Sequence, residues 1–511
     1  MVLARRQPDL PELPANGNGH ATSVALDELT VLLPLLNESY CRETTRYLAA
    51  ATQEKIWYAE LVVRTVMNDR IRALAPTFGV DVPVVAKWAI KALRTRARRD
   101  YALSVILFLF PLVPVLAFLW VPALVCLPLL LIAAWFAVSW EYWERIHNVI
   151  TRKMLWDRFS LQEAPAPRRE SDRRRLEVVA QRRDGNLVVF SGYNAFIGSG
   201  WPLQQKHVLI DVSRGVKDDG GNPQEPEPFT SQDLHTALVE AFGRNVGLGA
   251  RLDNVSAYER LFVNGRHVQN DKRLRPKPAQ PPETLVSREL LTEATLRPTP
   301  EARTYVCVEM VGWQGQLVVT LFVRAVRVGD SLYLEWEFRV LPPLRKDLLN
   351  IDARFEVPFY FQLWESMRTG MRDLIIGLLG APFRTYVRWH RPYVIRRYER
   401  GHAYAVKNGL GFDYGAKRSI REKACGKQLH HHFLARDHVM YLLLAQQTLS
   451  DAVTNFLRDH KIDQGEFDEQ VSVIINDIRQ TYNNVNVNES TGVVIGDNSK
   501  ASVGDQSKGA K

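Results

Sequence analysis

The stretch SGYNAFIGSGW at 191–201 is the first candidate for chemistry, because glycine-rich loops that follow a strand can cradle phosphate. Its glycines are Gly192, Gly198 and Gly200. Pro202 and a second strand pattern follow them, whereas a phosphate-binding loop needs Lys and Ser or Thr at the start of a helix. The pattern therefore favours a structural turn whose glycines adopt positive φ.

Metal-binding residue types gather further along, where 430–432 is a run of three histidines near Cys425, Asp437 and His438. Their spacing matches neither HExxH nor CxxC, so we predict no metal site. The sequence contains no nucleophile elbow, paired-carboxylate signature or kinase motif. We therefore predict no catalytic residue and no cofactor; enzymatic activity stays open, and the sequence leans against it.

The segment 371–401 interleaves aromatic residues with arginines. This composition is typical of an element that lies at a membrane surface and neutralises anionic lipid. A surface helix of a soluble domain is an equally weighted alternative. The predicted membrane-surface contacts are Arg384, Arg388, Arg391, Arg396, Arg397 and Arg400.

A membrane is implied by the stretch 102–140, which contains no Asp, Glu, Lys, Arg, Asn, Gln or His. One spanning helix needs about 20 apolar residues, so this stretch is long enough for two. We place the turn around Trp120, Val121 and Pro122, because proline disfavours helical geometry in the residue before it. The alternatives are a re-entrant hairpin that does not reach the far side and a buried hairpin in a soluble protein.

Basic residues crowd both flanks of this hairpin, for example Arg94 to Arg99 before it and Arg168 to Arg175 after it. Basic flanks stay in the cytoplasm, so we expect two spans in the cell membrane with both termini cytoplasmic. The net charge of +10 then suits the anionic inner-leaflet headgroups. No nucleic-acid-binding motif is present, and we predict no nucleic-acid partner. The four cysteines show no pairing pattern, which suits a reducing compartment.

The predicted fold class is α+β: N-terminal helices, a two-helix transmembrane hairpin, a cytoplasmic antiparallel-sheet domain with C-terminal helices, and a β-prone or disordered tail. Strand patterns at 304–311, 316–328 and 331–341 predict an antiparallel meander. The expected regions are a disordered 1–23, a helical 24–100 that packs on the later domain, the hairpin 101–140, a juxtamembrane helix and basic linker 141–175, the α+β domain 176–478 and the tail 479–511.

The tail carries a short imperfect repeat, VIGDN at 494–498 and SVGDQ at 502–506. Alternating valines between Asn, Gly and Asp are typical of short strands that stack in register. The tail is similar to bacterial amyloid-type signalling motifs, which implies β-stacked assembly; a disordered polar tail is the alternative. The predicted assembly residues are Val493, Val494, Ile495, Gly496, Asp497 and Asn498.

GYNAFIGSGW also resembles the G-Y-x-P-F-x-G-x-G loop of a family of actinobacterial integral membrane proteins, with Ala195 in place of the proline. Segments 305–344 and 412–422 resemble the same family, and the resemblance implies no particular activity. We therefore expect a membrane-anchored scaffold or signalling protein that forms a homo-oligomer or recruits a partner sharing its tail motif. The alternative is a lipid- or ligand-binding protein or enzyme at the inner membrane surface.

Overall fold

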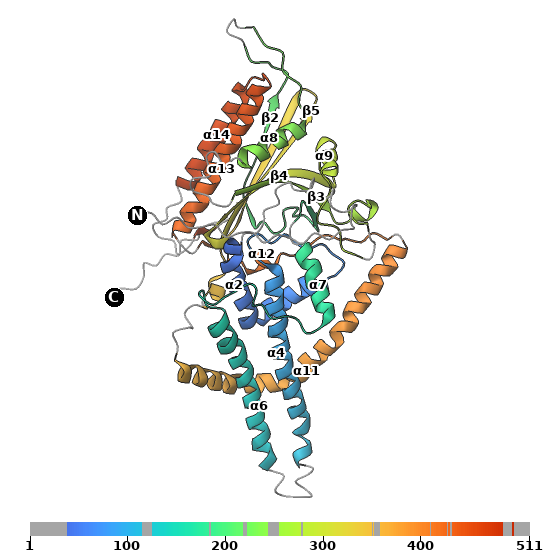
Figure 1. Ribbon diagram of the computed structural model, residues 1–511, viewed down its shortest axis with the longest axis vertical. Coiled ribbons are helices and arrows are strands. Elements are labelled where there is room, and N and C mark those ends of the chain that lie inside the picture. The colour runs from blue at the N-terminus through green and yellow to red at the C-terminus, as the bar shows by residue number, and fades with distance from the viewer. Residues whose placement is uncertain are drawn as a thin grey trace, which may run out of the picture.

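The computed structural model describes residues 38–114, 125–182, 185–217, 222–243, 255–276, 280–349, 351, 358–408, 410–426, 428–429, 432–483 and 493–494. Figure 1 shows an elongated molecule in three tiers. A sheet with its helices forms one end, the N-terminal helices lie in the middle, and two long helices project from the other end. The fold is mixed α and β, as the sequence predicts.

The upper tier is built on a six-stranded sheet with the strand order β1-β3-β4-β5-β6-β2. Residues 304–341 form the predicted antiparallel meander, β4-β5-β6. The sheet is not purely antiparallel, however, because β1 pairs with β3 in parallel. The expectation of an antiparallel sheet is wrong at this edge, where β1 and β3 belong to separate excursions of the chain. The strands are β1 (Leu187–Phe190), β2 (Trp201–Asp211), β3 (Val255–Asn264), β4 (Ala302–Gly312), β5 (Leu317–Val328) and β6 (Ser331–Leu341).

Helices cover one face of this sheet. Every second residue of β6, from Leu332 to Val340, enters a core shared with α8 (Ser231–Gly243), α13 (His432–Asp459) and α14 (Gly465–Asn483). This spacing follows from the two-residue period of a strand. A smaller aromatic core lies on the other face, where Phe196 stacks on Phe322 with ring centroids 4.1 Å apart. Both faces are therefore apolar, which explains the continuous apolar pattern of β4 and β5.

The glycine-rich loop that contains Phe196 is a structural turn. Gly192, Gly198 and Gly200 all adopt positive φ. A Cβ on Gly198 would lie 2.3 Å from the carbonyl oxygen of Pro76, so the loop is held against the N-terminal region. The carboxylate of Glu422 accepts hydrogen bonds from the backbone N–H groups of Gly198 and Gly200 at 2.7 and 3.0 Å. The loop thus binds its own chain, and the prediction of a structural turn is confirmed.

The middle tier joins the N-terminal helices to the later chain. Tyr58, Val85 and Ile420 share one buried core, and the hydroxyl of Thr44 donates to the carbonyl of Gln314 at 3.1 Å. Part of the predicted basic linker is helical, because α7 occupies Glu170–Gln181. This tier contains α2 (Glu38–Glu54), α3 (Ile56–Val62), the π-helical turn η1 (Val63–Asn68), α7 and the short α12 (Ile420–Ala424). The remaining short elements are η4 (Val268–Asn270), α9 (Arg288–Leu296), η5 (Trp313–Gly315), α10 (Lys346–Leu349), β7 (Gln428–Leu429) and β8 (Val493–Val494).

The lower tier consists of α4 (Val82–Leu109), α6 (Cys126–Trp143) and α11 (Phe359–Lys407). α4 and α6 run side by side as the two arms of the predicted hairpin, whose turn at Trp120, Val121 and Pro122 lies outside the described residues. α6 continues into the π-helical η3 (Glu144–Thr151). α11 is one continuous helix, with Pro382 and Pro392 inside it. It crosses the other two helices and then bends upward toward the sheet (Figure 1). Within the described residues, one helix, Cys126–Thr151, is long and apolar enough to cross a membrane.

Candidate membrane-facing site

Two buried carboxylates mark the base of the projecting helices. Asp100 directly precedes the apolar stretch, and its side chain is 0% exposed. Three arginines surround it: Arg99 at 2.8 Å, Arg384 at 3.2 Å and Arg388 at 3.0 Å. Burial alone would raise the pKa of Asp100, but these guanidinium groups outweigh it and hold the pKa below its usual value. Asp100 is therefore a buried anion that joins α4 to α11.

Glu141, which directly follows the apolar stretch, joins α6 to α4 in the same way. Its carboxylate accepts from Arg99 at 3.3 Å and pairs with Arg96 and Arg145. Arg96 in turn donates to the carbonyl of Gln53 at 2.6 Å, which ties the cluster to α2. The hairpin is thus closed at its base by a charged network that connects four helices.

α11 crosses this hairpin at very short range. A Cβ on Gly370 would lie 2.0 Å from the hydroxyl oxygen of Ser139 and 3.1 Å from its backbone nitrogen, so glycine here lets the two helices approach closely. One turn nearer the tip, the indole N–H of Trp135 donates to the carbonyl of Met367 at 3.0 Å. Small residues at four-residue spacing are typical of helix contacts within membranes. Two such pairs of α11 residues lie at the crossing, Ser366 with Gly370 and Gly377 with Ala381.

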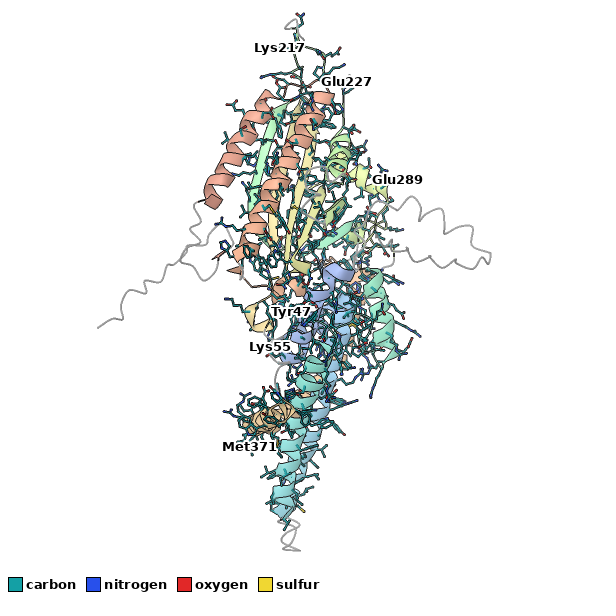
Figure 2. The ribbon with its side chains drawn as sticks, turned by 60° about the vertical axis from the view of Figure 1, so that its left-hand side comes forward. Tyr47, Lys55, Lys217, Glu227, Glu289 and Met371 are labelled. Carbon is teal, nitrogen blue, oxygen red and sulfur yellow. The ribbon has the colours of Figure 1, made fainter. Side chains whose placement is uncertain are left out.

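The first limb of α11, residues 359–380, has one polar side and one apolar side. The carboxylate of Glu365 accepts from the hydroxyl of Tyr142 at 2.7 Å and lies 4.0 Å from the ring of His147, so its polar side faces the middle tier. Met367 and Met371, two and six positions further along, point away from Glu365 on a helix, so the side of the limb that faces away from the middle tier is apolar there. Figure 2 shows Met371 on this limb. Trp364 and Ile375, on the flank of the same limb, are also apolar and exposed.

Large apolar side chains also cover the hairpin beyond the crossing. Phe108 on α4 is 75% exposed and Phe136 on α6 is 60% exposed. A soluble monomer seldom exposes so continuous an apolar surface, and surfaces of this kind mark protein or membrane contacts. The other exposed residues of the two arms are Val105, Leu109, Leu112, Val125, Leu129, Leu131 and Ile132.

The predicted membrane-surface arginines divide into two groups. Arg384 and Arg388 bind Asp100, and Arg391 is partly buried against the side-chain amide of Asn68. The other three are exposed on the second limb of α11, which climbs away from the hairpin tip (Figure 1); they are Arg396, Arg397 and Arg400. Arg384 and Arg388 therefore stabilise the helix crossing, and Arg391 contacts the middle tier. Sequence analysis missed Asp100 and Glu141, although their positions at the two ends of the apolar stretch were a usable signal.

Of the predicted assembly residues, Val493 and Val494 form β8. This strand pairs antiparallel with β7, in register Gln428 with Val494 and Leu429 with Val493. Ile495, Gly496, Asp497 and Asn498 lie outside the described residues. The start of the predicted assembly segment thus adopts extended backbone and pairs with its own chain.

The histidine-rich region does not converge on one point. His438 is buried and hydrogen-bonds the carbonyl of Ala435, while Asp437 accepts from the indole of Trp313 at 2.8 Å. Cys425 is buried and donates to the carbonyl of Arg421. His430 and His431 lie outside the described residues. Among those described, no group of three potential metal ligands comes together.

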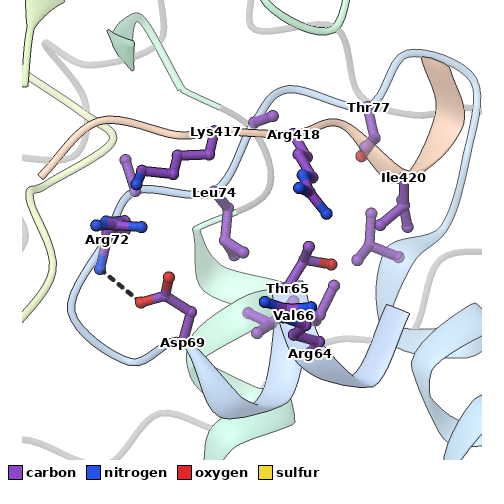
Figure 3. Close-up of a pocket in the computed structure, with 14 residues that line it drawn as sticks. Arg64, Thr65, Val66, Asp69, Arg72, Leu74, Thr77, Lys417, Arg418 and Ile420 are labelled. Atoms are coloured by element: carbon purple, nitrogen blue, oxygen red, sulfur yellow. Dashed lines mark hydrogen bonds between the residues drawn. The ribbon is translucent and has the colours of Figure 1, made fainter. Parts of the chain in front are cut away.

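Two cavities lie in the middle tier and at the base of the hairpin. The first has a volume of about 260 Å³ and is shown in Figure 3; Arg64, Arg72 and Arg418 contribute to its walls, and Asp69 accepts from the backbone N–H of Arg72 at 3.2 Å. The second, of about 540 Å³, lies between α4, α6 and residues 165–168. Neither is lined by the glycine-rich loop or by residues 384–400, so neither cavity joins those two segments.

A family model described as an AbeC-like domain matches residues 203–499. The match covers more than half of the chain and includes segments 305–344 and 412–422, but it begins after the glycine-rich loop at 191–201. No curated protein gives a significant match to the chain, and no solved structure does. The family description names no activity, so the functional argument rests on the site itself.

Replacing Asp100 by Asn should lower the free energy of unfolding by about 3 kcal/mol, because three arginines would then surround a neutral buried group. Asp347→Asn is the matched control, since that carboxylate is 39% exposed and pairs with Arg345 at the surface. The control should change the free energy by less than about 1 kcal/mol. Urea unfolding of the full chain in detergent micelles measures both variants. Equal, small effects would contradict the structural role of Asp100.

Proposed function

We propose that this chain, which belongs to the AbeC-like domain family, is a membrane-anchored scaffold that holds its α+β domain at the cytoplasmic surface. The observation that carries the proposal is the exposure of its apolar hairpin. In the most apolar 18-residue window of the helix Cys126–Thr151, only 22% is buried, whereas the core helix of a soluble protein is mostly buried.

The bilayer is the partner that this surface fits. Each large apolar side chain moved from water into hydrocarbon contributes about 1.5–3 kcal/mol, and the hairpin offers many of them. The apolar side of the first limb of α11 faces the same direction, which is the geometry of a helix lying in the membrane interface. The charged network around Asp100 and Glu141 then lies at headgroup level, where water and phosphate can solvate its outer arginines.

The orientation proposed is two spans with both termini in the cytoplasm. From the crossing at Leu103 to the predicted turn at Trp120 is 17 residues, which a helix covers in about 26 Å. The hydrocarbon core is about 30 Å thick, slightly more than this length. The first limb of α11, lying in the interface, covers the difference. Basic residues lie on the body side of the crossing, in agreement with the preference for positive charge in the cytoplasm.

A second proposal concerns the tail, which we infer acts as an assembly segment. The pairing of Val493 and Val494 with β7 supports it, because it places extended backbone at the start of the VVIGDN segment. A strand that pairs with its own chain through two residues can exchange for the same segment of another copy, since β-pairing uses backbone groups that every copy carries. Assembly would then concentrate anchored copies in one patch of membrane.

The anchor is tested by placing charge on the exposed face of α6. Ile132→Lys with Phe136→Lys should move the full chain from the carbonate-resistant membrane fraction into the soluble fraction. Each lysine costs about 2.5–3.5 kcal/mol at the centre of a spanning helix, and neither side chain is needed for the core. Leu296→Lys with Val473→Lys is the control, because these residues are similarly exposed on the sheet tier. If the chain with Ile132→Lys and Phe136→Lys stays in the carbonate-resistant membrane fraction, the proposal is refuted.

The number of spans is tested by cysteine labelling in intact cells. Cys41, Cys307 and Cys425 are buried, so Cys126→Ser leaves a chain without exposed cysteine among the described residues. On that background, Trp120→Cys should react with a membrane-impermeant maleimide added outside. Arg158→Cys, at a position 59% exposed on the cytoplasmic side, should react only after lysis. Labelling of position 120 only after detergent treatment would show a re-entrant hairpin and refute two spans while leaving the anchor intact.

Tail assembly is tested in the full chain by Val494→Lys with Ile495→Lys. Like charges stacked in register repel one another, so clustering of fluorescently tagged protein in membranes should disappear. Ser507→Lys with Ala510→Lys adds the same charge beyond the repeat and should leave clusters unchanged. If the chain with Val494→Lys and Ile495→Lys clusters like the unmodified chain, the assembly segment lies elsewhere.

A further inference from the structure

A stripe of cations follows one face of α4 toward the membrane. Lys87, Lys91, Arg94 and Arg98 are spaced by four, three and four residues, which places them on the same side of the helix. The stripe continues to Ala102, where the apolar stretch begins. It lines the second cavity, a groove of about 540 Å³.

The groove has three walls. α4 forms the first wall and residues 165–168 form the third. The second is the end of α6 with the first residue of η3, and its residues are Ala137, Trp140, Glu141 and Glu144. Lys91 pairs with Glu144 at 3.6 Å, and Arg99 is engaged by Asp100 and Glu141. The remaining cations of the groove form no ion pair within 4 Å in the described part of the chain; they are Lys87, Arg94, Arg98 and Arg168.

These unpaired cations repel one another. Burial, followed by the neighbouring charge of Arg168, lowers the pKa of the Arg94 guanidinium, although Asp172 opposes the shift. A bound anion would relieve this repulsion. Phosphate suits a site of this kind, because arginine presents a planar fork that matches its oxygens.

The membrane end of the groove is apolar. Ala102, Ala137 and Trp140 line it, and the indole of Trp140 is 55% exposed. Trp140 lies beside Glu141 at the base of the hairpin. The apolar end of the groove therefore opens toward the hairpin surface. A free phosphate ion would leave this end empty, whereas a phospholipid carries an anionic headgroup and an acyl chain on one molecule.

We propose that this groove is a binding site for an anionic phospholipid, with its phosphate between Arg94, Arg98 and Arg168 and the start of an acyl chain along Ala102 and Trp140. The inference rests on the membrane anchor proposed above and specifies its partner. It moves the main anionic-lipid contact from the arginines of α11, three of which have partners within the chain, to the opposite side of the hairpin base.

The test uses the full chain in neutral detergent micelles, titrated with short-chain phosphatidylglycerol, short-chain phosphatidylcholine or inorganic phosphate and followed by native mass spectrometry. Arg94→Gln with Arg98→Gln should weaken phosphatidylglycerol binding roughly thirty-fold, which corresponds to about 1 kcal/mol for each lost cation. The control Arg288→Gln with Arg297→Gln removes the same charge from exposed positions of the sheet tier and should bind like the unmodified chain.

A second variant, Ala102→Leu, fills the apolar end while keeping every arginine, and it should also weaken phosphatidylglycerol binding. Binding that persists in both groove variants would overturn the proposal, as would equal binding of phosphatidylcholine or displacement of the lipid by equimolar inorganic phosphate. Because micelles do not require insertion into a bilayer, this result is independent of carbonate extraction. Loss of the anchor and loss of the lipid site are therefore told apart.

Discussion

The structure depends on how two buried carboxylates are neutralised. Asp100 and Glu141 lie at the two ends of the apolar stretch, and arginines from α4, α11 and η3 converge on them. A buried carboxylate without such partners would cost several kcal/mol, so the ion pairs determine which helices may meet at this level. The crossing of α11 over the hairpin follows from this constraint, since Arg384 and Arg388 reach Asp100 only from there.

The same network separates two environments along the molecule. Above it, polar and charged contacts join the middle tier to the sheet tier through residues such as Thr44 of α2 and Glu422 of α12. Below it, the exposed surface of α4 and α6 is almost entirely apolar. The amphipathic limb of α11 follows this division, with Glu365 directed upward and Met371 on the opposite side. The surfaces of α4, α6 and α11 thus change from polar to apolar at the same level of the molecule. An interface between water and lipid would require such a common level.

Charge on the two sides of the hairpin base has different uses. On the α11 side, arginines form ion pairs with a buried carboxylate and thereby hold the helices together. On the groove side, Arg94, Arg98 and Arg168 meet one another with few anions nearby. Composition counts both groups equally as basic flanks. The α11 arginines have carboxylate partners and a structural role, whereas the groove arginines lack such partners among the described residues and are free to bind an anion.

Much of the organisation was determined by the sequence alone, because it follows from local patterns. The length and apolarity of 102–140 predict the two projecting helices, the two-residue period predicts the β4–β6 meander, and the glycines of 191–201 predict a turn with positive φ. Tertiary structure alone decided the rest, since it depends on contacts between distant segments. The parallel pairing of β1 with β3, the capture of Arg384 and Arg388 by Asp100, and the groove between α4 and residues 165–168 each require chain segments that no local pattern relates. A side chain's role as clamp or binding site depends on which opposite charge folding brings within about 4 Å, and that distance is a property of the packed fold.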